Sequence, residues 1–322
     1  MQELSAYLEE DIAKVSLLMQ ESLESDISLL SETNRGLLSN GGKMIRPITA
    51  LLVARALGGC NSDTYLFAAA AELIHNATLM HDDVADSSAL RRGRPTVVSL
   101  LGPRPSVLLG DFWLVKGIDR ILDSQKYGNR VMRIFGRTLS HLAEGEMLQL
   151  ELARTGGTTE DDYYKVIFDK TASLFEASAV SAVISTGAPE TYVEAVSKFS
   201  RCLGMAFQIK DDIFDYQEEA SIGKPTGQDL REKKITLPLL GAMKMHPSDE
   251  KEIRAKVCEI DSHPEYVAGI MDFVRKCGGI SYADKKMKNF LKEAVAALDV
   301  FAPSREKEFL TAMADYIAER KY

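Results

Sequence analysis

Residues 75–96 read HNATLMHDDVADSSALRRGRPT, an apolar helical run that carries three aspartates and is followed by three arginines. Asp82 and Asp86 are four residues apart, so they share one face of a helix, with Asp83 beside them. The apolar neighbours indicate that this turn packs against other helices. Close carboxylates in such a place repel one another and resist desolvation, so they need a cation.

Almost every other segment of the 322 residues also has helical periodicity, and we find no convincing strand pattern. Helices are predicted over residues 4–15, 23–30, 48–57, 66–80, 112–122, 131–152, 171–185 and 193–213. The last two lack a polar face, which predicts buried helices. Glycine and proline separate these segments, and we expect the most mobile loops at 223–231 and around Pro103. No Pro-, Gly- or Ser-rich linker divides the chain, so residues 1–322 are expected to form a single all-α domain.

The composition narrows the function. A formal net charge of −8 argues against non-specific binding to nucleic acid, although local basic clusters still allow an anionic substrate. The four cysteines form no CxxC pair, which indicates reduced thiols in a cytoplasmic protein. The N-terminus is acidic and amphipathic, unlike a secretory signal, and no apolar run has the length of a membrane span.

The acidic pattern recurs in FQIKDDIFDY, where Asp211, Asp212 and Asp215 follow another apolar helix. A single DDxxD is more typical of a solvated face or a cap, but two copies on buried helices favour a metal site. Ligands that are all oxygen suit Mg²⁺, or Mn²⁺, better than zinc. Mg²⁺ takes only one or two carboxylates and completes its shell with substrate phosphate. Two facing acidic boxes are therefore expected to hold a phosphorylated ligand through metal ions.

Basic residues precede the first box in GGKMIRP, where Pro47 is placed as the first residue of a helix. Its glycine turn, Lys43, Arg46 and helix N-terminus form a plausible diphosphate cradle. Taken alone, the same motif would be read as a basic turn before a capped helix.

Arg91 and Arg92 follow the first box directly, and the planar guanidinium suits phosphate because it donates two parallel hydrogen bonds. The alternative is a salt bridge to Asp86 or to a neighbouring helix. Further cations occur later in the chain at Lys170, Lys224 and Lys234. Their number favours two phosphate groups, one held by metals and cations, the other by cations alone.

Seven motifs in order carry a resemblance over most of the chain: GGKMIRP, IHNATLMHDDVADSSALRRGRPT, GDF, AEGEMLQL, DKTASLFEAS, GMAFQIKDDIFDY and GKPTGQDLREKKITLPLL. The chain resembles the trans-prenyl diphosphate synthases, which elongate isoprenoid chains head to tail, and is most similar to the octaprenyl type. The resemblance implies a helical bundle around a deep central cavity, usually as a homodimer. It also implies that isopentenyl diphosphate is condensed with an allylic prenyl diphosphate.

The resemblance assigns roles to particular residues. Three Mg²⁺ ions would be held by Asp82, Asp83, Asp86, Asp211, Asp212 and Asp215. The allylic diphosphate would be bound by Arg91, Lys170, Lys224 and Lys234. The diphosphate of isopentenyl diphosphate would be bound by Lys43, Arg46, His75 and Arg92. The reacting carbons would be lined by Thr171 and Gln208. Without the resemblance, His75 and Gln208 would be interpreted as ordinary buried polar residues. Lys233 could replace its neighbour, but the position before ITLP favours Lys234.

The expected chemistry needs no nucleophilic side chain, and the sequence contains no HExxH, Walker loop or Ser/His/Asp arrangement. Diphosphate leaves an allylic carbon while Mg²⁺ and fixed cations stabilise the developing charge. The alkene of isopentenyl diphosphate attacks the allylic cation, and by family analogy a proton then leaves.

Product length is predicted from the helix that carries the first box. Thr78 lies one turn before Asp82, Ile74 one turn earlier, and Ala77 beside them. Bulky aromatics near these positions stop growth early in the family, so the small Ala77 and Thr78 favour a product longer than farnesyl, as for quinone side chains. Trp113 is a possible deeper floor or an ordinary packing residue.

Other functions remain as alternatives. A short-chain synthase making farnesyl or geranylgeranyl diphosphate differs only in product length. A terpene cyclase lacks the cation set for a second diphosphate, so Lys43, Arg46 and Arg92 favour the elongating enzyme. A silent partner subunit tends to lose an acidic box, and a plain helical scaffold has no use for two. The exact product length and the preferred allylic primer are left open.

Overall fold

The computed structural model describes residues 2–39, 42–91, 93–217 and 226–320. The chain forms two compact units, each made of segments that are distant in sequence. Unit 1 comprises residues 1–136, 177–196 and 303–310, and unit 2 comprises residues 137–176, 197–302 and 311–322. The expectation of one domain spanning residues 1–322 stays a prediction.

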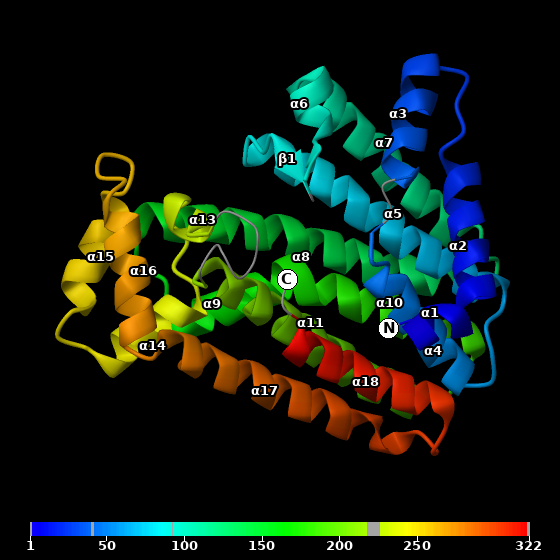
Figure 1. Cartoon of the computed structure of the whole chain (residues 1–322). Coiled ribbons are helices and arrows are strands. Elements are labelled where there is room, and N and C mark those ends of the chain that lie inside the picture. Colours follow the sequence, from blue (N-terminus) through cyan, green and yellow to red (C-terminus); the bar gives the residue numbers. More distant parts are fainter. Residues whose placement is uncertain (1, 40–41, 92, 218–225, 321–322) are drawn as a thin grey trace. The chain divides into compact units, whose positions relative to one another are not determined.

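The all-α prediction is confirmed, because helices make up nearly all of the regular structure (Figure 1). The helices of the N-terminal half are α1 (Gln2–Tyr7), α2 (Glu9–Ser22), α3 (Ser28–Ser39), α4 (Ile45–Ala56), α5 (Ser62–Ala85), α6 (Val97–Leu101), α7 (Pro103–Leu122) and α8 (Gly128–Thr155). The later ones are α9 (Glu160–Ile167), the π-helical η1 (Phe168–Ala172), α10 (Ser173–Thr186), α11 (Glu190–Asp215), α13 (Gln228–Arg231), α14 (Leu237–Met245), α15 (Glu250–Cys258), α16 (Tyr266–Lys276), α17 (Gly279–Ala297), the 3₁₀ turn η2 (Leu298–Val300) and α18 (Arg305–Glu319).

Unit 1 is organised around α5 and α7, which lie against each other (Figure 1). Asn61 starts α5 with a capping box, accepting a hydrogen bond from the Thr64 N–H at 3.0 Å. Two glycines, seven residues apart on α7, allow the close approach. A Cβ at Gly110 would lie 2.4 Å from His81 Nε2, and one at Gly117 would lie 2.7 Å from Ile74 Cγ1. The apolar face of the helix bearing the first box is therefore covered by α7.

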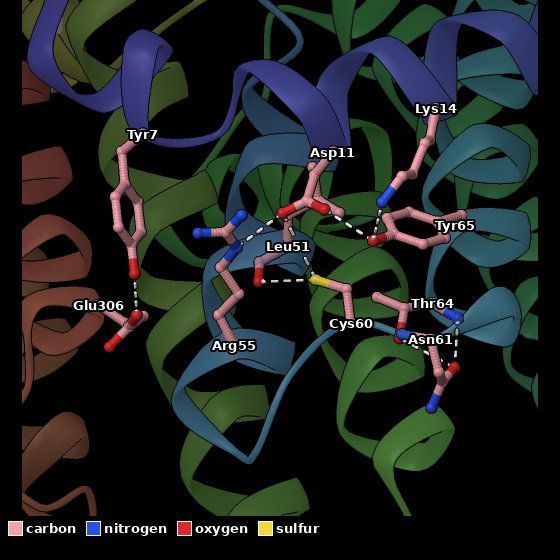
Figure 2. Close-up of polar contacts among 10 residues, drawn as sticks. All are labelled: Tyr7, Asp11, Lys14, Leu51, Arg55, Cys60, Asn61, Thr64, Tyr65 and Glu306. Carbon is pink, nitrogen blue, oxygen red and sulfur yellow. Dashed lines mark hydrogen bonds and ion pairs between the residues drawn. The ribbon is translucent and has the colours of Figure 1, made fainter.

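A buried carboxylate fastens α2 to α4 and α5 within the same unit (Figure 2). Asp11 accepts hydrogen bonds from Arg55 Nε at 2.6 Å and from the Tyr65 hydroxyl at 2.7 Å. Burial, together with the nearby Asp11 charge, raises the pKa of the Cys60 thiol to about 12. Cys60 is therefore an unreactive packing residue, which agrees with the prediction of reduced thiols.

Unit 2 contains a close approach between α11 and η1. A Cβ at Gly204 would lie 2.6 Å from the Cα of Ala172, so only glycine fits without a shift. A second tight contact joins α14 and α17, where a Cβ at Gly279 would lie 2.1 Å from the carbonyl oxygen of Pro238. The first of these contacts holds the segment that carries Lys170 and Thr171 against the helix that carries the second acidic box.

Several sequence predictions need correction. Two short strands, β1 (Leu90–Arg91) and β2 (Arg94–Pro95), form a hairpin that we did not expect. Each strand has only two residues, which is too short to give an alternating pattern in the sequence. The helix predicted to start at Pro47 begins at Ile45, and α7 begins at Pro103, where a loop was expected. The segment 193–213 has a polar face, so it is only half-buried.

Of the loop predicted at 223–231, residues 223–225 lie outside the described residues and 228–231 form α13. Among the helices described, none is both long and apolar enough to cross a bilayer.

Candidate active site

The first aspartate box lies at the C-terminal end of α5. Asp82 is in the last turn, and Asp86 caps the helix, its N–H bonding to the Asp82 carbonyl oxygen at 2.8 Å. Asp83 points inward and is 5% exposed. The negative end of a helix dipole disfavours carboxylates, so three of them here are costly unless a cation binds. Burial raises the pKa of Asp83, although Arg91 opposes the shift.

The hairpin after α5 folds Arg91 back onto this box. Its Nε and Nη2 atoms both lie 2.8 Å from Asp83 Oδ1. The salt bridge that we weighed as an alternative for Arg91 therefore exists, but it goes to Asp83, not to Asp86. Gly93 permits the tight turn with φ +75°. Arg92 lies outside the described residues.

The cations assigned to the second diphosphate also belong to unit 1. Lys43 is exposed and Arg46 half-buried at the start of α4, which follows Met44 in the left-handed conformation at φ +47°. The carbonyl oxygen of Arg46 accepts a hydrogen bond from the Ser178 hydroxyl at 3.2 Å. His75 is half-buried on α5, two turns before the first box.

The second box lies at the C-terminal end of α11, in unit 2, so the same dipole argument applies. Asp211 forms an ion pair with Arg320 at 2.8 Å. Asp212 is 5% exposed and accepts two hydrogen bonds, from the Tyr163 hydroxyl at 2.5 Å and from Gln208 Nε2 at 2.9 Å. Each carboxylate is thus oriented by a different group.

Asp215 completes the second box and is held by backbone groups. Its oxygens accept hydrogen bonds from the N–H groups of Gln228 at 3.0 Å and Asp229 at 2.9 Å. Burial raises the pKa of Asp212 to about 7, and it also raises the pKa values of Asp215 and Asp229. Burial disfavours the charged form of each carboxylate, and repulsion between neighbouring carboxylates adds to the upward shift of these pKa values.

The basic residues of unit 2 lie beside acidic partners. Lys170, in the π-helical segment, forms an ion pair with Glu146. Lys234 pairs with Glu232, and its charge partly offsets the raised pKa of Asp229, next to the second box. Lys233 pairs with Asp261, so both lysines have acidic partners, and the choice of Lys234 as the diphosphate ligand stays a prediction. Lys224 lies outside the described residues.

The donor set suits a hard divalent cation, because both boxes offer only carboxylate oxygens. Across the described ranges, no three acidic, His or Cys side chains form a ready-made metal cage. That is compatible with Mg²⁺, which takes one or two carboxylates and otherwise binds water and phosphate. The clustered, buried carboxylates with raised pKa values are the feature that such an ion would relieve.

The residues predicted to control product length are on or near α5 in unit 1. Ile74 and Ala77 are buried, and the Thr78 hydroxyl bonds to the His75 carbonyl oxygen at 2.8 Å. Trp113 is 1% exposed, and its Nε1–H donates to Asn34 Oδ1 at 2.8 Å. Trp113 is therefore a satisfied packing residue, and its part in setting product length stays a prediction.

Comparison with known proteins agrees with these features. The family model for polyprenyl synthetase matches residues 27–274. The chain belongs to the polyprenyl synthetase family. Octaprenyl diphosphate synthase of Escherichia coli (strain K12) is 34% identical over 312 residues, which are 97% of this chain and 96% of the relative. The chain is accordingly a transferase of prenyl groups.

Two further relatives have names that refer to products of different length. A crystal structure of a decaprenyl diphosphate synthase from Rhodobacter capsulatus is 36% identical, with a TM-score of 0.92 and coverage of 100% of this chain and 99% of that one. Geranylgeranyl diphosphate synthase of Methanosarcina mazei is 30% identical over 91% of this polyprenyl synthetase and 90% of the relative. Relatives of this polyprenyl synthetase thus include enzymes named for short and for long products.

Three residues at the second box were missed from the sequence. Tyr163 and Arg320 each contact an aspartate of the box, and Asp229 lies against it. Tyr163 and Arg320 are distant from the box along the chain, so no local spacing could have revealed them. Asp229 was within the quoted GKPTGQDL motif, where a lone carboxylate gave no signal.

Proposed function

We propose that this polyprenyl synthetase condenses isopentenyl diphosphate with an allylic prenyl diphosphate, head to tail and in the trans configuration, in a reaction that depends on Mg²⁺. The observation that carries the proposal is the pair of DDxxD boxes, each at the C-terminal end of a long helix. Carboxylates at this end of a helix favour a cation, and a phosphorylated substrate completes the shell of the ion.

The proposal assigns the two diphosphates to different groups of cations. The allylic diphosphate binds at the aspartate boxes together with Arg91, Lys170, Lys224 and Lys234. The diphosphate of isopentenyl diphosphate binds to Lys43, Arg46, His75 and Arg92. This division is supported by the nature of the groups, since one set combines acids with bases and the other is basic throughout.

Side chains of the protein orient the substrates and stabilise the charge that develops on the leaving diphosphate. When bound, Mg²⁺ neutralises the diphosphate that leaves the allylic carbon. Arg91 and Lys170 add fixed positive charge at the same oxygens, where it counts most in the ionised state. Thr171 and Gln208, which hydrogen-bond to each other beside the second box, are proposed to line the reacting carbons. The departing diphosphate is proposed to accept the final proton.

The assay that tests this function uses the purified chain with Mg²⁺, isopentenyl diphosphate and allylic primers of several lengths, followed by mass spectrometry of the products. Asp82→Ala and Asp211→Ala should each lower turnover about 100-fold or more while leaving the helical content intact. Asp63→Ala, in the first turn of the same helix as Asp82, serves as the control and should keep wild-type turnover. Wild-type turnover in either box variant would refute the metal assignment.

The same assay separates the alternatives. A terpene cyclase would release a hydrocarbon and leave isopentenyl diphosphate unconsumed, whereas a silent subunit would give no product as a single chain.

For product length, we propose a medium or long chain, because Ala77 and Thr78 are small; the alternative is a short-chain enzyme. We also propose a cytoplasmic location and a homodimer.

A further inference from the structure

Tyr163 touches the second aspartate box through its hydroxyl group. It lies on α9, is 3% exposed, and its hydroxyl is 2.5 Å from Asp212 Oδ2. The other oxygen of Asp212 accepts a hydrogen bond from Gln208 Nε2 at 2.9 Å. Both oxygens of the carboxylate are therefore held by neutral donors, and the plane of the carboxylate is fixed.

The hydrogen-bonded chain extends one residue further. The Thr171 hydroxyl donates to Gln208 Oε1 at 2.8 Å, which turns the amide so that its NH₂ group faces Asp212. The close contact of Gly204 with Ala172 brings α11 near enough to the π-helical segment for this bond to form. Thr171 is placed by a π-helical turn, a feature that recurs at functional sites.

The kind of donor matters as much as its position. Asp211 has a cationic partner in Arg320, which cancels its charge. The partners of Asp212 are a phenol and an amide, which orient the carboxylate and leave its negative charge in place. A lysine or arginine in their place would compete with a metal ion for the same oxygens. A neutral donor stabilises the carboxylate without such competition.

We propose that Tyr163 is a positioning residue of the second box, which presents the Asp212 carboxylate to a divalent metal ion, and that Thr171 assists from the other side through Gln208. Tyr163 itself contacts no substrate in this arrangement. This inference rests on the proposed function, because it presumes that Asp212 faces a metal ion. Loss of such an outer hydrogen bond typically weakens metal affinity 10- to 100-fold.

The adjacent tyrosine provides a matched control. Tyr164 is on the same helix, and its hydroxyl donates to Glu160 at 2.9 Å, away from the second box. Tyr163→Phe and Tyr164→Phe each remove one hydroxyl from a hydrogen-bonded tyrosine of α9. Only the first should alter the binding of a metal ion if Tyr163 positions Asp212, whereas a general loss of packing would affect both.

The experiment measures metal binding apart from catalysis. The full chain is titrated with Mn²⁺ alone, free ion being followed by electron paramagnetic resonance, and the Mg²⁺ concentration for half-maximal consumption of isopentenyl diphosphate is determined separately. Tyr163→Phe should raise both values at least fivefold and leave the KM for isopentenyl diphosphate within twofold. Tyr164→Phe should change neither value more than twofold.

The outcomes are distinct. A rise of less than fivefold in Tyr163→Phe overturns the inference, as does an equal rise in both variants. If Tyr163→Phe does not fold, Gln208→Leu removes the other hydrogen bond to Asp212 and is judged by the same fivefold threshold for Mn²⁺. The wild type is measured first, and failure to bind Mn²⁺ or to consume isopentenyl diphosphate would count against the proposed function itself.

Discussion

The aspartates of the second box differ in how readily a metal ion can take up their charge. Arg320 already neutralises Asp211 and stacks on the ring of Phe207, its guanidinium carbon 4.0 Å from the ring centroid. A divalent ion at Asp211 must compete with this guanidinium. Among the described residues, the hydrogen-bond donors to Asp212 are a phenol and an amide, neither of which carries a charge. A metal ion at this box would thus meet one carboxylate that is paired with a guanidinium and one that is oriented by neutral donors.

A single residue on α5 should control product length. Ala77 is 1% exposed, and a tyrosine there would occupy the space through which the growing prenyl tail is proposed to run. We expect Ala77→Tyr to give shorter products than the wild type, as measured by mass spectrometry with the same primer. Ala77→Ser adds one oxygen atom and should leave the product length unchanged. A folded Ala77→Tyr enzyme with wild-type products would show that the tail does not pass this point.

At the scale of single residues, spacing in the sequence was enough to find both boxes but not their partners. Asp82 and Asp86 share a helical turn, so four-residue spacing identified them. Arg91 was recognised as a cation, yet its bond to Asp83 depends on a two-residue hairpin that leaves no periodic signal. Tyr163 reaches Asp212 only through packing of distant helices, which the sequence does not encode locally.

Helices α9, α14 and α17 are joined by one carboxylate. Glu160 accepts hydrogen bonds from the Tyr282 hydroxyl at 2.7 Å and from Lys244 Nζ at 3.2 Å, and it forms an ion pair with Lys286 at 2.7 Å. Burial alone would raise the pKa of Glu160, but these donors outweigh it and lower the pKa to about 2. The ionised form of Glu160 is therefore more stable in the folded state than in the unfolded chain.

This shift predicts a pH dependence of stability. Because the folded-state pKa is below the unfolded value of 4.5, the contribution of Glu160 is fully present above pH 4.5 and is lost as the pH falls towards 2. Glu160→Gln should lower the free energy of unfolding by about 1–3 kcal/mol at pH 7. The difference from wild type should shrink below pH 4.5 in urea titrations.

The control for this experiment is an exposed ion pair. Glu190 contacts Arg130 at 2.8 Å, with the two side chains 65% and 52% exposed, so Glu190→Gln should cost less than about 1 kcal/mol at any pH. A difference between wild type and Glu160→Gln that stays constant from pH 7 to pH 2 would contradict the assignment.

Helices themselves were predictable because their apolar periodicity is strong, whereas their ends and burial were less so. Burial of α10 was predicted correctly from its sequence, because this helix has no polar face. The same argument wrongly predicted that α11 has no polar face. Its exposed residues Glu194 and Lys198 are four positions apart and lie on its outer face. Tertiary packing decides which of two mixed faces turns inward.

At the scale of the molecule, one surface of unit 1 suggests the proposed homodimer. Leu108, Val115 and Leu122 recur every seventh residue on α7 and are 59%, 53% and 49% exposed. Large apolar side chains at seven-residue intervals form a seam suited to a second helix. The opposite face of α7, with Gly110 and Gly117, is already occupied by α5. A second copy of the chain supplies an identical seam, as a two-fold interface requires.

Breaking this seam should therefore separate the subunits. Leu108→Glu combined with Val115→Glu places two like charges in each half of the interface, and the desolvation and repulsion should raise the dimer dissociation constant at least 100-fold. Sedimentation velocity over a range of concentrations measures this directly. Met245→Glu, at a 61% exposed position on α14, introduces the same charge elsewhere and should leave the dimer intact. A wild-type chain that sediments as a monomer, or a double variant that remains dimeric, would rule out this face of α7 as the subunit contact.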